Sequence, residues 1–85
     1  MKATVNIAHF LGTSRSMYDS EVTNGKIIRT TAKGAVLIEG DHKTMGRVIV
    51  WIAPFMIQKQ MYVGHTTTYI IYPYTELKYK SITNQ

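Results

Sequence analysis

Residues 26–54 constrain the fold of this chain more than any other segment. They contain three short runs rich in Val, Ile and Thr, separated by connectors that carry Gly. The runs read IIRTT, AVLIE and RVIVWI, and residues 32–34 and 40–46 connect them. Because β-branched residues favour strands and Gly favours tight turns, this pattern predicts a three-stranded antiparallel meander. Everything else in the chain must cover that sheet or extend it.

The runs differ in the spacing of their apolar residues. Residues 47–52 alternate, so that one face carries Val48, Val50 and Ile52 and the other carries Arg47, Ile49 and Trp51. The two earlier runs are apolar on both faces, which indicates a curled sheet or a face covered by a second subunit. The connector at 32–34 ends in Gly34, which fits a type I turn followed by a left-handed residue.

The segment before the meander predicts one strand and a long connector. Alternation over residues 2–8 predicts the first strand. Residues 12–25 are polar throughout and predict either a solvated loop, with a helical turn at 16–21, or a binding loop. The Asn24-Gly25 dipeptide predicts a tight turn that leads into the next strand.

The segment after the meander predicts further strands. Pro54 ends the third run, and residues 55–57 predict a single tight turn with apolar side chains directed onto the core. Strands are predicted at 58–63 and 67–72, with a turn at Gly64-His65. Residues 74–82 predict either a lysine-bearing edge strand or a short helix.

Length and composition predict one small domain that spans residues 1–85. With no Cys, the chain has no disulfide or thiolate site to support a thin core, so self-association into a homo-oligomer is expected to help. The N-terminus lacks the pattern of a signal peptide, and no run reaches the roughly 20 apolar residues of a membrane span. We therefore expect a cytoplasmic protein without membrane contact.

The end of the meander resembles an SH3-like small barrel. There, a strand runs into a hydrophobic-Pro step and a single 3₁₀ turn, as residues 51–54 and Ile57 do here. Met17-Tyr18-Asp19 is similar to the Tyr-Asp element of peptide-binding SH3 domains. The paired tryptophans are missing, the connector is not acidic, and Ala53 is an extra residue. The resemblance implies topology alone: an all-β, partly open antiparallel barrel of five or six strands, SH3-like or OB-like.

The sequence contains no motif for catalysis, for metal binding or for cofactor binding. The three histidines have no spacing that would gather them at a metal, and solvated histidines are expected at His42 and His65. The five carboxylates lie in polar, Gly-bordered contexts where nothing predicts the burial that raises a carboxyl pKa. Neither a nucleophile elbow nor a phosphate-binding glycine loop occurs. We expect a binding protein that is not an enzyme and holds no cofactor.

Basic residues interleaved with aromatic ones indicate the kind of partner. Ten Lys and Arg face five Asp and Glu, which gives a net charge of +5 and favours an anionic partner. We therefore expect nucleic acid, single-stranded or structured, to bind a sheet face that carries both residue types. Backbone contacts are predicted for Arg29, Lys33, Lys43 and Arg47, and contacts by aromatic rings for Trp51, Tyr69, Tyr72 and Tyr74.

Three other interpretations remain open at this point. Tyr and Trp are also favoured anchors of protein interfaces. The chain could thus be a protein–protein module, such as a small phage or plasmid inhibitor or adaptor that presents residues 12–25 and its Tyr-rich C-terminal third to an acidic protein surface. A pocket for a negatively charged nucleotide is a further alternative. In the simplest case, Trp51 and half of the tyrosines only fill the core.

Overall fold

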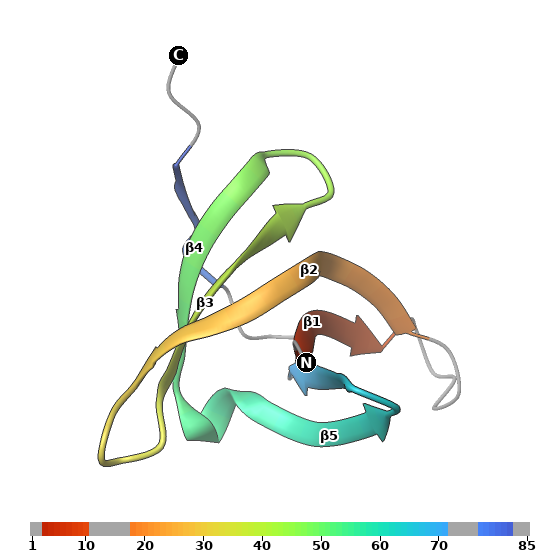
Figure 1. Ribbon diagram of the computed structural model, residues 1–85, viewed down its shortest axis with the longest axis vertical. Coiled ribbons are helices and arrows are strands. Elements are labelled where there is room, and N and C mark those ends of the chain that lie inside the picture. Colours follow the sequence, from red (N-terminus) through yellow and green to blue (C-terminus); the bar gives the residue numbers. More distant parts are fainter. Residues whose placement is uncertain (1–2, 11–17, 72–76, 83–85) are drawn as a thin grey trace.

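The computed structural model describes residues 3–10, 18–71 and 77–82 of the 85. These residues form strands and a single 3₁₀ turn, η1 (Pro54–Met56). The strands are β1 (Thr4–Phe10), β2 (Tyr18–Thr30), β3 (Val36–His42), β4 (Gly46–Ile52), β5 (Ile57–Val63), β6 (Thr66–Ile71) and β7 (Lys80–Ser81) (Figure 1). The predicted all-β class is confirmed. In this part of the chain, no helix is long and apolar enough to cross a membrane.

All seven strands belong to one sheet in the order β5-β6-β1-β2-β3-β4-β7. The sheet is not closed into a barrel, and it has seven strands rather than the predicted five or six. The meander formed by β2, β3 and β4 is antiparallel, as predicted. The pairing of β1 with β6 is parallel, which differs from the antiparallel prediction. A hairpin pattern in the sequence reports neighbouring strands only, so it carries no information about this long-range pair.

Strand β2 bends the sheet. It has 13 residues and pairs with β1 along its first half and with β3 along its second half. Register shifts interrupt the pairing between Thr23 and Lys26, where Asn24 has a positive φ of 52°. Bulges of this kind increase the local twist of a strand. The predicted loop at 12–25 is therefore wrong from Tyr18 onward, and Asn24-Gly25 forms a bulge inside a strand instead of a turn.

Close backbone packing accompanies this bend. A Cβ atom added at Gly25 would lie 2.5 Å from the carbonyl oxygen of Val5, and one added at Gly40 would lie 2.5 Å from Cγ1 of Val22. Larger side chains at these two positions would force β1, β2 and β3 apart. The curled arrangement in Figure 1, in which β2 crosses from the β3–β4 hairpin to β1, depends on this close approach.

The core lies on one face of the curled sheet. Its buried members are Val5, Ile7, Val22, Val36, Ile38, Val48, Val50, Ile52, Tyr69 and Ile71. The predicted faces of β4 are confirmed, because its three even-numbered apolar residues are buried and Arg47, Ile49 and Trp51 are not. The predicted turn after Pro54 is present, but Phe55 is 82% exposed and does not reach the core.

The C-terminal segment forms the edge of the sheet beside β4, opposite the edge formed by β5. Strand β7 pairs with β4, and the amide of Ile82 donates a hydrogen bond of 3.1 Å to the carbonyl oxygen of Arg47. Leu77 and Tyr79 pack against the core, whereas Lys78 and Lys80 are exposed. The predicted edge strand is thus confirmed only for its last residues. The part of the prediction at 74–76 lies outside the described residues.

Candidate functional site

Cross-strand pairing arranges the side chains of the face opposite the core in rows. Residues directly opposite each other in an antiparallel pair project from the same face. The first row runs from Arg29 on β2 through Leu37 on β3 to Trp51 on β4. On the far side of β4, Ile49 pairs with Lys80 of β7, and Lys78 precedes β7 on the same segment. We call the side formed by β2, β3, β4 and β7 the outer face.

The second and third rows complete the outer face. The second row contains Lys26, Glu39, Ile49 and Lys80, and the third contains Thr23, Asp41 and Arg47. Each row thus begins at a charged or polar residue of β2, and Leu37, Ile49 and Trp51 form an apolar strip on β3 and β4. This pattern follows directly from the alternation of β3 and β4, whose other residues fill the core.

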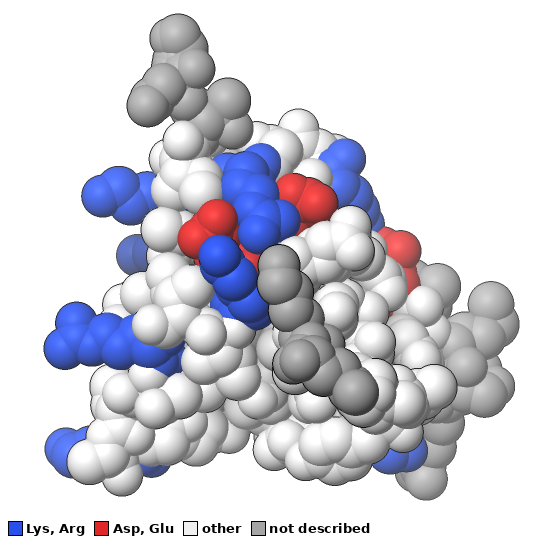
Figure 2. Space-filling view, viewed as in Figure 1, with Lys and Arg blue, Asp and Glu red and all other residues white. Residues whose placement is uncertain are grey.

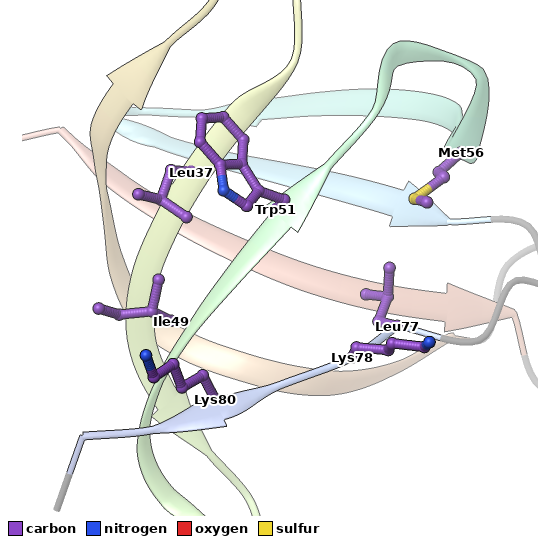
Figure 3. A pocket seen from close by; sticks show the side chains of 7 residues that line it. All are labelled: Leu37, Ile49, Trp51, Met56, Leu77, Lys78 and Lys80. Atoms are coloured by element: carbon purple, nitrogen blue, oxygen red, sulfur yellow. The ribbon is translucent and has the colours of Figure 1, made fainter.

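A pocket of about 530 Å³ opens on the outer face. It is lined by Leu37, Ile49, Trp51, Met56, Leu77, Lys78 and Lys80, which come from β3, β4, η1 and the C-terminal segment (Figure 3). Figure 3 shows Trp51 next to Leu37 on one side, and Met56 and Leu77 on the other. The indole of Trp51 is 44% exposed. The pocket therefore has an apolar lining, an accessible aromatic ring and two lysines at its edge.

Carboxylates already pair with two of the predicted phosphate-binding residues. The guanidinium of Arg47 donates to Asp41 at 2.9 Å and to Glu39 at 3.3 Å. Its hydrogen bond lowers the pKa of Asp41 below its ordinary value, and Asn24 adds to the effect. Lys43 pairs with Asp19, which lowers the pKa of that carboxyl group. These cations therefore hold the fold together, and their charge is largely balanced.

Other cations on the outer face have no carboxylate partner among the described residues. They are Lys26, Arg29, Lys78 and Lys80, together with Lys33 in the β2–β3 turn. Figure 2 shows the same division: acidic groups lie among basic ones in the upper part of this view, whereas basic groups along the left margin stand apart from acidic ones. The uncompensated positive charge of the outer face therefore lies on β2, on the β2–β3 turn, and on β7 with the residues just before it.

The structure brings only some of the predicted site residues together. Arg29 and Trp51 share the first row, Lys33 lies in the turn that joins β2 to β3, and Arg47 lies in the third row. Tyr69 is 8% exposed and belongs to the core, so its predicted role as a stacking ring is wrong. Burial raises the pKa of its phenol. Tyr72 and Tyr74 lie outside the described residues.

Sequence reasoning missed several residues of the pocket. Leu37, Ile49, Met56 and Leu77 were expected only as part of the general apolar pattern, and Lys80 as part of an edge strand. The alternation of β4 already placed Ile49 on the same face as Trp51. Nothing in the local sequence indicates that the C-terminal segment lies beside β4, because that contact joins segments about 30 residues apart.

A second group of ionisable side chains lies where the end of β1, the start of β2 and the end of β3 meet. The carboxylate of Glu21 lies 3.3 Å from Nδ1 of His9 and 3.3 Å from Nε2 of His42. The amides of Thr44 and Met45 both donate to Nδ1 of His42, so the ring proton is on Nε2 and faces Glu21. His42 is thus a partnered, largely buried residue and not the solvated histidine expected.

This group of side chains also anchors the C-terminal segment. The ring of Tyr79 meets that of His42 edge-on, at a centroid distance of 4.6 Å. Burial, with the carboxylate of Glu21, raises the pKa of Tyr79 far above its ordinary value. Within the described ranges, no group of three or more metal-ligating side chains has a geometry that could hold a metal ion. We therefore regard this group as structural support for the wall of the pocket.

Comparisons with known proteins found no matching family model, no matching curated protein and no matching solved structure.

Proposed function

We propose that this protein binds nucleic acid through its outer face and acts by binding, without catalysis. One observation carries the proposal: an accessible aromatic residue, Trp51, lies in an apolar strip, and the cations on both sides of the strip have no carboxylate partner within the described ranges. Proteins that bind single strands combine a positive groove for the backbone with aromatic rings on which bases stack. Arg29 lies in the same row as Trp51, and Lys78 and Lys80 line the opposite side of the pocket (Figure 3), which suits phosphates on both sides of a base.

The charge distribution favours an anionic polymer over a second copy of the chain. Two copies that met through this face would bring the same lysines together, and each copy carries a net charge of +5. A neutral apolar partner would leave Lys78 and Lys80 without compensation at the edge of a contact. Phosphate groups provide that compensation at every nucleotide.

A protein–protein module is the second candidate, supported by a different surface. Phe55, Tyr62 and Val63 are between 70% and 82% exposed, and they lie on η1 and the edge strand β5. Exposed aromatic groups beside an edge strand are suited to a protein partner that adds a strand to the sheet. Phe55 is next to Met56, which lines the pocket, but Tyr62 and Val63 on β5 do not line it, so the two candidates can be tested independently through β5.

Binding to labelled 20-nucleotide RNA and DNA strands in a series of salt concentrations tests the proposal. Fluorescence anisotropy should show an affinity that falls with salt, with a log–log slope of about −0.7 for each phosphate contacted on a single strand. The double variant Lys78→Ala/Lys80→Ala should bind more weakly, and its slope should be smaller by about 0.7 for each lysine removed.

Lys59→Ala is the matched control, because Lys59 is exposed on β5 at the opposite edge of the sheet. It removes the same type of charge and should leave both affinity and slope nearly unchanged. If the control and the double variant lose affinity equally, the nucleic acid is attracted nonspecifically to a basic chain. Absence of binding at low salt would refute the proposal, and capture of an acidic protein through β5 would then favour the second candidate.

A further inference from the structure

We propose that the pocket at Trp51 is a subsite for one unpaired, unstacked base, and that Lys78 and Lys80 bind the phosphates beside that base. The inference rests on the proposed function and narrows it to single-stranded nucleic acid. The pocket, at about 530 Å³, falls in the range of roughly 300–1,000 Å³ that is typical of small-ligand sites. It can therefore receive a base and part of its sugar.

The lining of the pocket separates a place for the base from a place for the phosphate. Leu37, Ile49 and Trp51 form the apolar side, and a base placed there would contact the indole face. The two lysines lie one strand further along, on the segment that pairs with β4. In Figure 3 the Lys80 side chain lies beside Ile49, and Lys78 lies beside Leu77 at the edge of the pocket.

The third row limits where the backbone of the nucleic acid can lie. Arg47 is engaged there by two carboxylates, at 2.9 Å and 3.3 Å, so this end of the outer face offers no net positive charge. Arg29 at the β2 end of the first row, and Lys78 and Lys80 at the edge of the pocket, have no carboxylate partner within the described ranges. A strand of nucleic acid should therefore run from Arg29 past Trp51 toward these two lysines.

A base in a duplex cannot reach such a pocket while it remains paired and stacked. Extruding a base from a duplex requires breaking its pairing and stacking, whereas an unpaired base is already accessible. The wall opposite Trp51 is also fixed in place. Leu77 packs against the core, and Tyr79 contacts the ring of His42, so the lysines between and beyond them are held at the edge of the pocket.

Trp51 is the only tryptophan of the chain, so its fluorescence reports occupancy of this pocket directly. The experiment titrates the full chain with a uridine-rich 8-mer, the same sequence in a duplex, uridine 5′-monophosphate and ribose 5-phosphate. Anisotropy of a labelled 8-mer is recorded in parallel. We expect the single strand and the mononucleotide to quench Trp51, and ribose 5-phosphate to leave its emission unchanged. The duplex should bind at least 10-fold more weakly than the single strand.

Variants separate the pocket from the rest of the outer face. Trp51→Ala should weaken binding of the 8-mer by about 5- to 150-fold, the range that corresponds to one lost stacking contact. Phe55→Ala removes an exposed aromatic ring that does not line the pocket and should change affinity less than 2-fold. Circular dichroism confirms that both variants keep the strand signal, and Trp51→Phe serves as a second variant if Trp51→Ala unfolds.

Two results would overturn the inference while the proposed function stands. One is binding of the 8-mer, seen by anisotropy, without any change in Trp51 emission. The other is equal affinity for the duplex and the single strand. Absence of binding by every ligand, in both readouts, would instead reject the proposed function itself.

Discussion

Tyr79 shows how one side chain links the core to the pocket. Its ring packs against the core and against His42. No hydrogen bond of ordinary geometry joins its buried hydroxyl to another described residue, although the carboxylate of Glu21 is close enough to raise its pKa. A buried polar group without a well-formed hydrogen bond costs stability. The ring is therefore favourable at this position, and the hydroxyl contributes little or is unfavourable.

Two substitutions at Tyr79 should accordingly have different effects. Tyr79→Phe keeps the ring and removes the hydroxyl, so the free energy of unfolding should stay within about 1 kcal/mol of the original or rise. Tyr79→Ala removes the ring and should lower it by about 2–4 kcal/mol. Urea unfolding at pH 7 measures both values. A large loss in the Phe variant would show that the hydroxyl has a strong partner.

Alkaline pH gives a second readout for Tyr79. Its pKa is raised in the folded chain, so the neutral phenol is the form that the fold favours. This contribution to stability is complete below the ordinary pKa of 10.0 and is lost as the pH rises above it. Tyr79→Phe should therefore lose less stability between pH 9 and pH 11 than the original chain. Tyr69, whose pKa is also raised, accounts for part of the pH dependence of stability that remains in Tyr79→Phe.

At the scale of elements, the β3–β4 hairpin carries its own charge pairs. Arg47 on β4 is paired with Asp41 and Glu39 on β3, and the pKa of Asp41 is lowered as a result. A carboxylate with a lowered pKa stabilises the fold above its ordinary value and loses that contribution as the pH falls below it. The hairpin should thus weaken in acid, below about pH 4.

Arg47→Ala tests this element. The variant should be less stable than the original chain at pH 6, and the difference between them should shrink as the pH is lowered from 5 to 3. The matched control is Arg29→Ala, because Arg29 has no carboxylate partner within the described ranges. Its effect should be small and independent of pH. Parallel acid profiles for all three proteins would show that the pairs of Arg47 contribute nothing measurable.

The elements differ in how well the sequence predicts them. Strand β4 was predictable to within a residue, since its alternation is strict and Pro54 marks its end. Strand β2 was not, because Ser, Asn and Gly normally indicate a loop, and here they occupy a bulged strand held by β1 and β3. Tertiary pairing decides such segments, and local composition does not report it.

The same limit applies to the candidate site. The face of Trp51 was predictable, because β4 alternates strictly. The face of Arg29 was not, because its run does not alternate and a register shift separates it from Ile27. Tyr69 was not distinguishable from an exposed tyrosine, since β6 is buried on both faces once it lies between β1 and β5. The role of Lys78 depends on a segment that lies beside β4 only in the folded molecule.

At the scale of the whole molecule, self-association remains a prediction. It was expected from strands that are apolar on both faces, and Ile27 and Ile28 are each 41% exposed near the end of β2. We expect sedimentation at increasing protein concentration to show a mass above that of a single chain, and Ile28→Lys to reduce it. A single-chain mass at every concentration would contradict the expectation.

The parallel pairing of β1 with β6 has a consequence for how the chain acquires its structure. Thr4 lies beside Thr66, so β1 cannot have a partner on both of its sides until residues 66–71 have been synthesised. The hairpins β2–β3 and β3–β4 are local and can form early, whereas the docking of β6 on β1 requires closing a long loop. Folding should therefore end with this docking, and until then one edge of β1 has no strand partner.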